Sequence, residues 1–507
     1  MPYRILAKKQ NGWSDDAPDG APAQSSITSP IRNSLRLSVT ELATCHFLSN
    51  FVLLPRFHGV RGYLEFVLPL LVLNGSSPPK LPHFKYAFEA CAMACFHFRV
   101  QRGRTCSLIA RGHYVKAISA TATALQDPEL SNQDSTLAAI LLLGYFENFV
   151  GEKAGIAAWS SHIDGAIQLV KARGSALMQT PIGRDLFLTV RTQMLSKVFI
   201  AASDPPMDIN WWDTALGSGD HFTAQAQQLH IRGAQLRLEV IRRLDSQSHS
   251  KSNVEAISAL VRHLRQLDQD FVSWAKSLPP QLFRPRTVAW IDSARHDRHV
   301  NNEGFTGRVD FYVDIMIAAL WNMYRCSRIL LWAVIVRLTA WGCKSLDYRT
   351  TPEYATAATT CVDMISDIIA SIPYHLGWNP SNGRATSFPQ HKLSSFACGD
   401  EQAAKCLGGY LATWPLTCIL AQDYTTDSQR AWVKGRLHYI SNDLGVRYAD
   451  GMVNMKLRMP SMLIQRDATT AAYKSFDNIL SGKAAPLVCP PLSTNITKSP
   501  LTAADQN

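Results

Sequence analysis

The stretch DSTLAAILLLGYFENFV, residues 134–150, is apolar on almost every side of the helix that it would form. A helix at a protein surface shows one apolar stripe and one polar face, so a segment with little polar face is typical of a helix buried on most sides. We therefore predict a core helix over residues 134–150, with the other helices of the chain packed around it.

The next segment, WSSHIDGAIQLVKARG at 159–174, places a histidine and an aspartate two residues apart and could be taken for an active site. On a helix, His162 and Asp164 point about 200° away from each other, so they cannot serve one site as an acid–base pair. Gly174 stands where a left-handed C-cap is expected. The spacing of the apolar residues favours an amphipathic helix whose buried stripe is Ile163, Ala166, Ile167 and Val170.

His162 lies at the edge of this apolar stripe, so we interpret it as a structural residue that bonds a neighbour. Glu147, in the preceding helix, is the first candidate partner. Gly165 and Ala166 are small, and we expect another helix, the one that carries GYFENF, to approach closely there.

Helical periodicity continues through most of the chain, and alternating strand patterns are scarce. It is clearest at 252–278, where Ser252 and Glu255 have capping-box spacing and two prolines end the pattern. Loops are expected at 204–222, 278–307 and 372–398. The fold class is predicted as all-α, a large multi-helix array of packed helix pairs. Further helices are expected near 83–99, 108–126, 181–202, 223–245, 308–342, 353–371, 400–422 and 427–444.

Composition indicates an intracellular protein with a large core. The chain has 507 residues, of which 46% are hydrophobic, and a formal net charge of +11 without a compact basic block. The 11 cysteines are odd in number and irregularly spaced, which favours reduced thiols in the cytosol or nucleus. The start, MPYRILAKKQNGW, does not fit a secretory signal, and no membrane association is expected. The long apolar region at 311–341 is interrupted by Asp314, Arg325, Arg328 and Arg337.

From its motifs, the sequence is predicted to have no catalytic residue, no cofactor and no metal site. The sequence contains no GxSxG, GxxxxGK[ST], GxGxxG, HExxH or DDxxD. Asn442, Asp443 and Asp450 and the SDPPMD stretch at 203–208 are interpreted as structural. The densest group of soft ligands is interpreted as buried core, because its surroundings are apolar and no CxxC pair occurs. That group is Cys91, Cys95, His97, Cys106 and His113.

Eight blocks of sequence, in order, resemble the regulatory domain of fungal-specific transcription factors. The third block has the family's aromatic-Glu pair (Phe146-Glu147) followed by W..H..GA..L...RG. The first four are FLSNFVLLPRFHGVRGYLEFVLPLL (47–71), AFEACAMACFHFRV (87–100), DSTLAAILLLGYFENFVGEKAGIAAWSSHIDGAIQLVKARG (134–174) and FVSWAKSLPPQLFRPRT (271–287). The last four are ALWNMYRCSRILL (319–331), ISDIIASIPYHLG (365–377), GGYLATWPL (408–416) and GRLHYISNDLGVRYADGM (435–452).

This resemblance implies a nuclear regulator of RNA polymerase II transcription and not an enzyme. Many members control secondary-metabolite gene clusters, and the helical domain contacts other regulators or a second copy and sometimes senses a small molecule. The resemblance implies a regulatory domain at 39–480, between disordered segments at 1–38 and 481–507 that are rich in small and polar residues.

The family's DNA reader is a cluster of six cysteines holding two zinc ions, and this sequence departs from that plan. Six thiolates must lie within about 30 residues to build such a cluster, yet the first cysteine here is Cys45 and only four precede residue 110. We therefore expect weak DNA binding without sequence preference. The alternative is a helical scaffold or co-regulator that acts without binding DNA.

Overall fold

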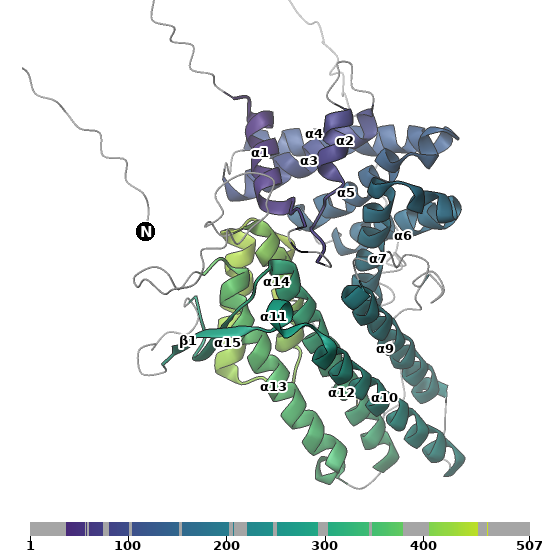
Figure 1. Ribbon diagram of the computed structural model, residues 1–507, viewed down its shortest axis with the longest axis vertical. Helices are drawn as coiled ribbons and strands as arrows, with labels where there is room; N and C mark the ends of the chain where they lie inside the picture. The colour runs from purple at the N-terminus through teal and green to yellow at the C-terminus, as the bar shows by residue number, and fades with distance from the viewer. Residues whose placement is uncertain are drawn as a thin grey trace, which may run out of the picture. The chain divides into compact units, whose positions relative to one another are not determined.

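A computed structural model describes residues 37–55, 57, 60–74, 81–100, 104–151, 155–201, 206, 221–246, 251–292, 303–343, 347–378, 405–454 and 464. The helices and strands belong to the compact unit that begins at Val39 (Figure 1). Almost all of the two segments predicted to be disordered, and most of the SDPPMD stretch, lie outside the described residues. The predicted bounds of the regulatory domain, 39 and 480, stay a prediction.

The all-α class predicted from the sequence is confirmed. The first helices are α1 (Val39–Phe51), α2 (Val67–Leu73), α3 (Pro82–Arg99), α4 (Arg104–Gln126), α5 (Asp134–Val150), α6 (Gly155–Arg173) and α7 (Pro181–Ala201). They are followed by α9 (His221–Ser246), α10 (Lys251–Ser277), α11 (Pro280–Phe283), α12 (Ile315–Cys343), α13 (Pro352–His375), α14 (Cys406–Leu420), α15 (Asp427–Asn442) and α16 (Tyr448–Asn454). Short 3-10 turns occupy Leu130–Asn132, Gly174–Gln179 and Tyr348–Thr350.

Three local predictions were wrong. The loop expected at 278–307 and the start of the next helix contain an antiparallel pair, β1 (Arg286–Ile291) and β2 (Gly307–Phe311). Helix α12 begins at Ile315 and not near 308, because the Asp314 carboxylate accepts the Met316 N–H at 2.7 Å and caps the first turn. Ser252 lies inside α10 and not at its N-cap.

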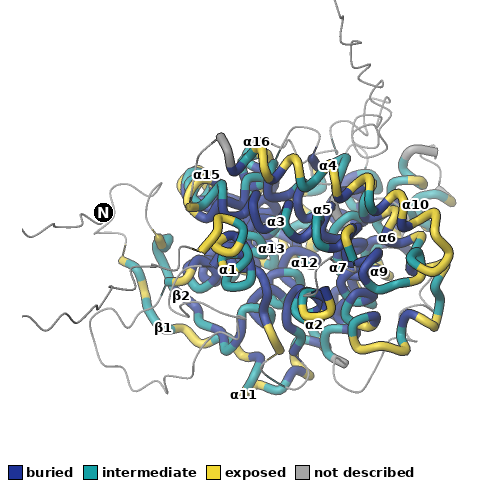
Figure 2. The backbone as a smooth tube through the Cα atoms, turned by 90° about the horizontal axis from the view of Figure 1, so that it is seen from above, coloured by how far each residue is buried: buried dark blue, intermediate teal, exposed yellow. Residues whose placement is uncertain are grey.

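Helix α5 is the central helix that its sequence predicts. Its side chains are buried almost all round, and Leu141 is fully buried. It packs against α3, α4, α6 and α7, and Figure 2 shows it among these four helices. Gly151 ends it with a φ of 64°, the left-handed conformation that glycine adopts without strain. The predicted C-cap at Gly174 is also confirmed, with a φ of 56°.

Helices α12 and α13 are long and apolar enough, by composition alone, to span a membrane. In the structure 72% of the apolar window of α12 is buried against protein, and α12 packs on α9, α10, α13 and α14 (Figure 1). Its charged residues have protein partners. Arg328 binds Asp268 through two N–H groups, at 2.7 and 2.9 Å, and Arg325 donates to the Tyr312 hydroxyl at 2.9 Å. The apolarity of α12 is therefore accounted for by its place in the core.

A group of tyrosines connects the early helices to α14. The Tyr63 hydroxyl donates to the Tyr145 hydroxyl of α5 at 2.9 Å, and Gln193 of α7 donates to the same oxygen at 2.8 Å. The ring of Tyr410, on α14, lies 5.9 Å from that of Tyr145. Tyr63 and Tyr145 are buried and Tyr410 is partly buried, and their contacts hold α5, α7 and α14 together.

Candidate functional site

The two residues that suggested an active site lie on different sides of α6. Asp164 is exposed and forms an ion pair with Lys197 of α7. His162 instead faces α4 and α5, where its Nε2 atom lies 3.2 Å from the Tyr114 hydroxyl. The prediction that the two residues cannot form one acid–base pair is confirmed. The buried stripe of α6, Ile163, Ala166, Ile167 and Val170, is confirmed as well.

His162 belongs to a short hydrogen-bonded chain that ends on a carboxylate. The Tyr114 hydroxyl donates its only hydrogen to Glu147, so the Tyr114 oxygen is left to accept from the Nε2–H of His162. Burial lowers the pKa of His162 to about 4, which keeps the ring neutral at physiological pH. Glu147, the partner predicted from the sequence, is thus reached through Tyr114, which sequence reasoning missed.

The close approach of α5 and α6 depends on a different glycine from the one predicted. Gly165 is exposed, and a Cβ atom there would meet no atom within 4 Å. Gly144, in α5, is the glycine at the contact. A Cβ atom on it would lie 3.5 Å from both the Cβ of His162 and the Cδ1 of Trp159. The expectation for Gly165 was therefore wrong, because the residue lies on the solvent side of α6.

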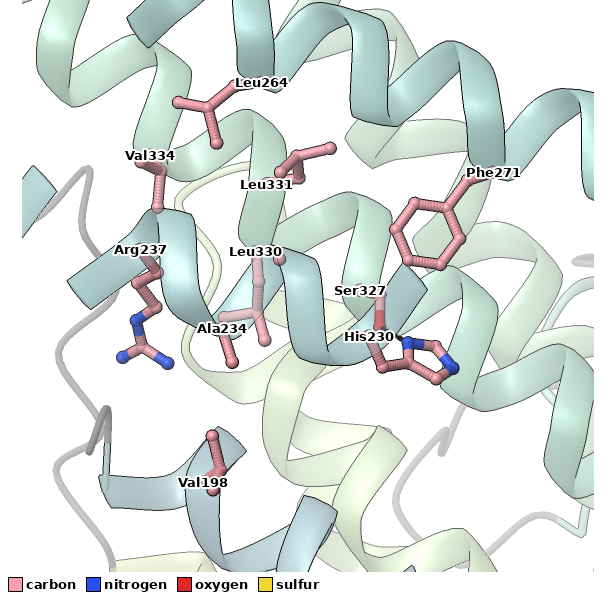
Figure 3. Close-up of a pocket in the computed structure, with 11 residues that line it drawn as sticks. Val198, His230, Ala234, Arg237, Leu264, Phe271, Ser327, Leu330, Leu331 and Val334 are labelled. Carbon is pink, nitrogen blue, oxygen red and sulfur yellow. Dashed lines mark hydrogen bonds between the residues drawn. The ribbon is translucent and has the colours of Figure 1, made fainter. Parts of the chain in front are cut away.

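A small cavity lies between α7, α9, α10 and α12 (Figure 3). His230 and Ser327 form a hydrogen bond of 2.7 Å at one end of it, and Arg237 projects from α9 further along. The remaining walls are apolar side chains such as Leu264, Phe271 and Leu331. Its volume of about 20 Å³ has room for about one water molecule, so in this conformation it does not accommodate a metabolite.

The polar residues at and after the end of α15, interpreted from the sequence as structural, lie in local contacts and caps. Asn442 accepts a hydrogen bond from Arg447 at 2.8 Å, and Asp450 lies 3.2 Å from the Nδ1 atom of His438. Asp443 is the C-cap residue of α15, and Val446 is fully buried. These contacts fit the structural role expected for this stretch.

The soft ligands clustered in the sequence are separated by the fold. Cys91 is buried and donates to the Leu142 carbonyl at 2.9 Å, and His113 pairs with Glu89 at 3.1 Å. Cys106 is buried on α4. Cys95 is buried too, but it faces two residues that lie far away in the sequence, His46 on α1 and Cys406 on α14.

His46, Cys95 and Cys406 form a compact group, and we call it the His-Cys-Cys cluster. Their ligand atoms all lie within 4.8 Å of one another. Burial raises the pKa of the Cys406 thiol, but Cys95, His46 and Arg99 together hold that pKa well below its ordinary value. Arg99 contributes an N–H that lies 3.1 Å from the Cys406 Sγ atom. Sequence reasoning missed this cluster because its members come from three distant segments, and it considered Cys95 only beside residues that are close in the sequence, on α3 and α4.

Comparison with known proteins identifies the class. The model of the fungal specific transcription factor domain matches residues 46–200, from His46 on α1 to the end of α7. This match confirms, for this part of the chain, the family resemblance predicted from the sequence.

The chain is similar to a curated protein named Transcription factor dbaG, from Emericella nidulans. The two are 24% identical over 343 residues, which cover 67% of this chain and 74% of the relative. This similarity extends well beyond the matched domain and supports a role in transcription regulation. No solved structure matches the chain.

Proposed function

We propose that this chain is a nuclear regulator of RNA polymerase II transcription in a fungus. The match of residues 46–200 to the fungal specific transcription factor domain carries the proposal. That region contains α5, the most completely buried helix of the region, and the helices packed around it. The similarity to Transcription factor dbaG over 67% of the chain supports the same role.

The contacts of α6 do not support catalysis by His162 and Asp164 as a pair. His162 is bound to Tyr114, and burial keeps its ring neutral. Asp164, which would have to orient it in an acid–base pair, is committed to Lys197. A histidine oriented by an aspartate needs that aspartate within hydrogen-bond reach of its ring, and these two residues do not meet that condition.

We further propose that the chain reaches its promoters through a partner, either another regulator or a second copy. The cysteines of this sequence do not have the spacing of the six-thiolate cluster, and the net charge of +11 by itself supports only weak contact with DNA phosphates. Control of a secondary-metabolite gene cluster is part of the proposal and rests on the resemblance to the family.

Two measurements on one strain test this proposal. The chain, tagged with a fluorescent protein at its own locus, should concentrate in the nucleus. RNA sequencing soon after induced depletion of the tagged protein should show a defined set of genes changing together, with a biosynthetic cluster among them. A tagged protein that stays outside the nucleus, with transcript levels unchanged after depletion, would contradict the proposal.

A further inference from the structure

The His-Cys-Cys cluster has the composition of a site for a soft metal ion. Thiolate sulfur and imidazole nitrogen are the donors that Zn²⁺ and Cu⁺ prefer, and a carboxylate-rich site would favour harder ions. Zn–S bonds of about 2.3 Å and Zn–N bonds of about 2.1 Å place ligand atoms roughly 3.5–4 Å apart around one ion. The three ligand atoms, which lie within 4.8 Å of one another, are already close to that arrangement.

The imidazole of His46 supplies a second observation that points to a ligand. Its Nε2 atom is buried, and among the described residues no hydrogen-bond partner meets it, although the Cys95 and Cys406 sulfurs lie nearby. A buried polar atom without a partner is costly, so such an atom needs an explanation such as a bound ion. His46 as a whole is only partly buried, whereas Cys95 and Cys406 are buried, so the cluster lies closer to solvent on its histidine side.

Surrounding residues orient the ligands as outer partners do in known metal sites. Asn50 donates to the His46 carbonyl at 2.9 Å and accepts the backbone N–H of Cys406 at 3.2 Å, so one side chain connects two of the ligand-bearing helices. Arg99 donates to both Asn50 and the Cys406 sulfur. Hydrogen bonds to thiolate and imidazole ligands fix their direction and stabilise the charged form of the sulfur.

We propose that His46, Cys95 and Cys406 bind one thiophilic metal ion, Zn²⁺ or Cu⁺, and that the ion joins α1, α3 and α14. Two thiolates and a neutral imidazole suit a three-coordinate Cu⁺, or a Zn²⁺ whose fourth ligand is water. Cys95 and Cys406 must each lose a thiol proton to bind as thiolates, and metal binding releases both protons to solvent. In the structure the Cys406 thiol donates to the Leu444 carbonyl at 3.0 Å, a hydrogen bond that is given up as the sulfur turns to the metal. The ion would link α1, the first described helix, to α14, which follows it by more than 350 residues in the sequence.

The test uses the purified full-length chain, reduced, freed of metal with a chelator and kept without oxygen. Co²⁺ serves as a spectroscopic probe, because thiolate ligands give it a sulfur-to-metal charge-transfer absorption. Zn²⁺ and Cu⁺ are then titrated separately against chromophoric chelators, which shows which ion the site prefers. We expect one equivalent of metal per chain, the charge-transfer absorption with Co²⁺, and a higher melting temperature when the preferred ion is bound.

Matched variants separate the cluster from other cysteines. Cys95→Ser and Cys406→Ser should lose the Co²⁺ absorption and the metal-dependent rise in melting temperature. Cys91→Ser should keep both, because Cys91 lies one turn away on α3 and faces Leu142. Circular dichroism shows which variants are folded, and the comparison uses only those.

Two results would overturn the proposal. One is a folded wild-type chain that takes up none of the three ions, including a chain whose Cys95 and Cys406 are found joined as a disulfide. The other is metal uptake that persists unchanged in both Cys95→Ser and Cys406→Ser, which would place the ion elsewhere.

Discussion

His162 shows which properties of a single residue could be predicted from the sequence and which could not. Its position at the edge of an apolar stripe could be predicted from the spacing of residues on α6, and so could its separation from Asp164. Its direct partner could not be predicted, because Tyr114 comes from α4 and only the packing of α4 against α5 brings it there. The same limit applies to Cys95, whose partners His46 and Cys406 lie in other segments.

His162→Ala should lower the free energy of unfolding by about 1–3 kcal/mol, because the Tyr114 oxygen loses its donor and a small cavity forms. Chemical denaturation of the purified chain measures this. Gln168→Ala, at an exposed position of the same helix, is the control and should change stability little. If His162→Ala keeps wild-type stability but loses activity on a reporter gene, the residue contacts a ligand or partner and the structural interpretation is wrong.

The stability of the folded chain should fall in mildly acidic solution. Burial lowers the pKa of His162 to about 4 and those of His230 and His375 to about 3. An unfolded histidine has a pKa of about 6.5, so between these values the unfolded chain binds more protons than the folded one. Each neutral buried histidine therefore contributes fully to the free energy of unfolding above about pH 6.5. This contribution is lost as the pH falls, by up to about 1.4 kcal/mol per pH unit for each histidine.

Melting temperatures measured from pH 7 to pH 4 test whether stability falls as the pH falls. His162→Gln should flatten part of the slope, because glutamine keeps an N–H donor but does not titrate. A melting temperature that rises as the pH falls through this range would contradict the assignment of neutral buried histidines.

At the scale of whole elements, helices with a clear apolar pattern were predicted with bounds close to those in the structure. Helix α5 has the bounds 134–150 in the structure as in the sequence, because its apolar run is continuous and glycine follows its last residue. The strands β1 and β2 were missed because each is only a few residues long and their pairing depends on the chain folding back. The capping box was assigned to Ser252, whereas the structure shows one at Thr426 and Gln429, at the start of α15.

The contact between α5 and α6 predicts that substitutions at two glycines will have different effects on stability. Gly144→Leu should destabilise the protein by about 1–3 kcal/mol, because the larger side chain must push His162 and Trp159 away. Gly165→Ala should leave stability unchanged or raise it by up to about 1 kcal/mol, because the position is exposed and alanine favours a helix.

Thermal melts of the two variants check this prediction. Gly144→Ala is an informative intermediate, since its Cβ would make only ordinary contacts at 3.5 Å. A stability loss at Gly165→Ala that exceeds the loss at Gly144→Leu would show that α6 faces its neighbours differently from the structure.

At the scale of the whole molecule, contacts between distant segments hold the helices together, and these are the features that a single sequence reveals least. The tyrosines at 63, 145 and 410 and the His-Cys-Cys cluster both connect the first helices to α14. The class of the fold and the family could be predicted because they depend on periodicity and on ordered blocks of sequence. The sites could not, because they depend on which helices meet.

DNA binding by the purified chain should be weak and without sequence preference, because it rests on dispersed positive charge. Such binding depends on counterion release and should weaken steeply as salt is raised. Gel-shift titrations at several salt concentrations measure both properties. Nanomolar affinity for one sequence over a scrambled competitor, at physiological salt, would show instead that the chain carries its own DNA reader.

The most direct test of the central claim, that this chain regulates transcription, is to tether it to a promoter. The chain is fused to an unrelated DNA-binding domain in a fungal host, and a reporter gene with that domain's binding sites is measured. We expect reporter expression to change severalfold relative to the DNA-binding domain alone, and the change to be lost in Leu141→Asp, which buries a carboxylate in the centre of α5. A well-expressed, folded fusion that leaves reporter expression unchanged in the chain's own host would contradict the claim.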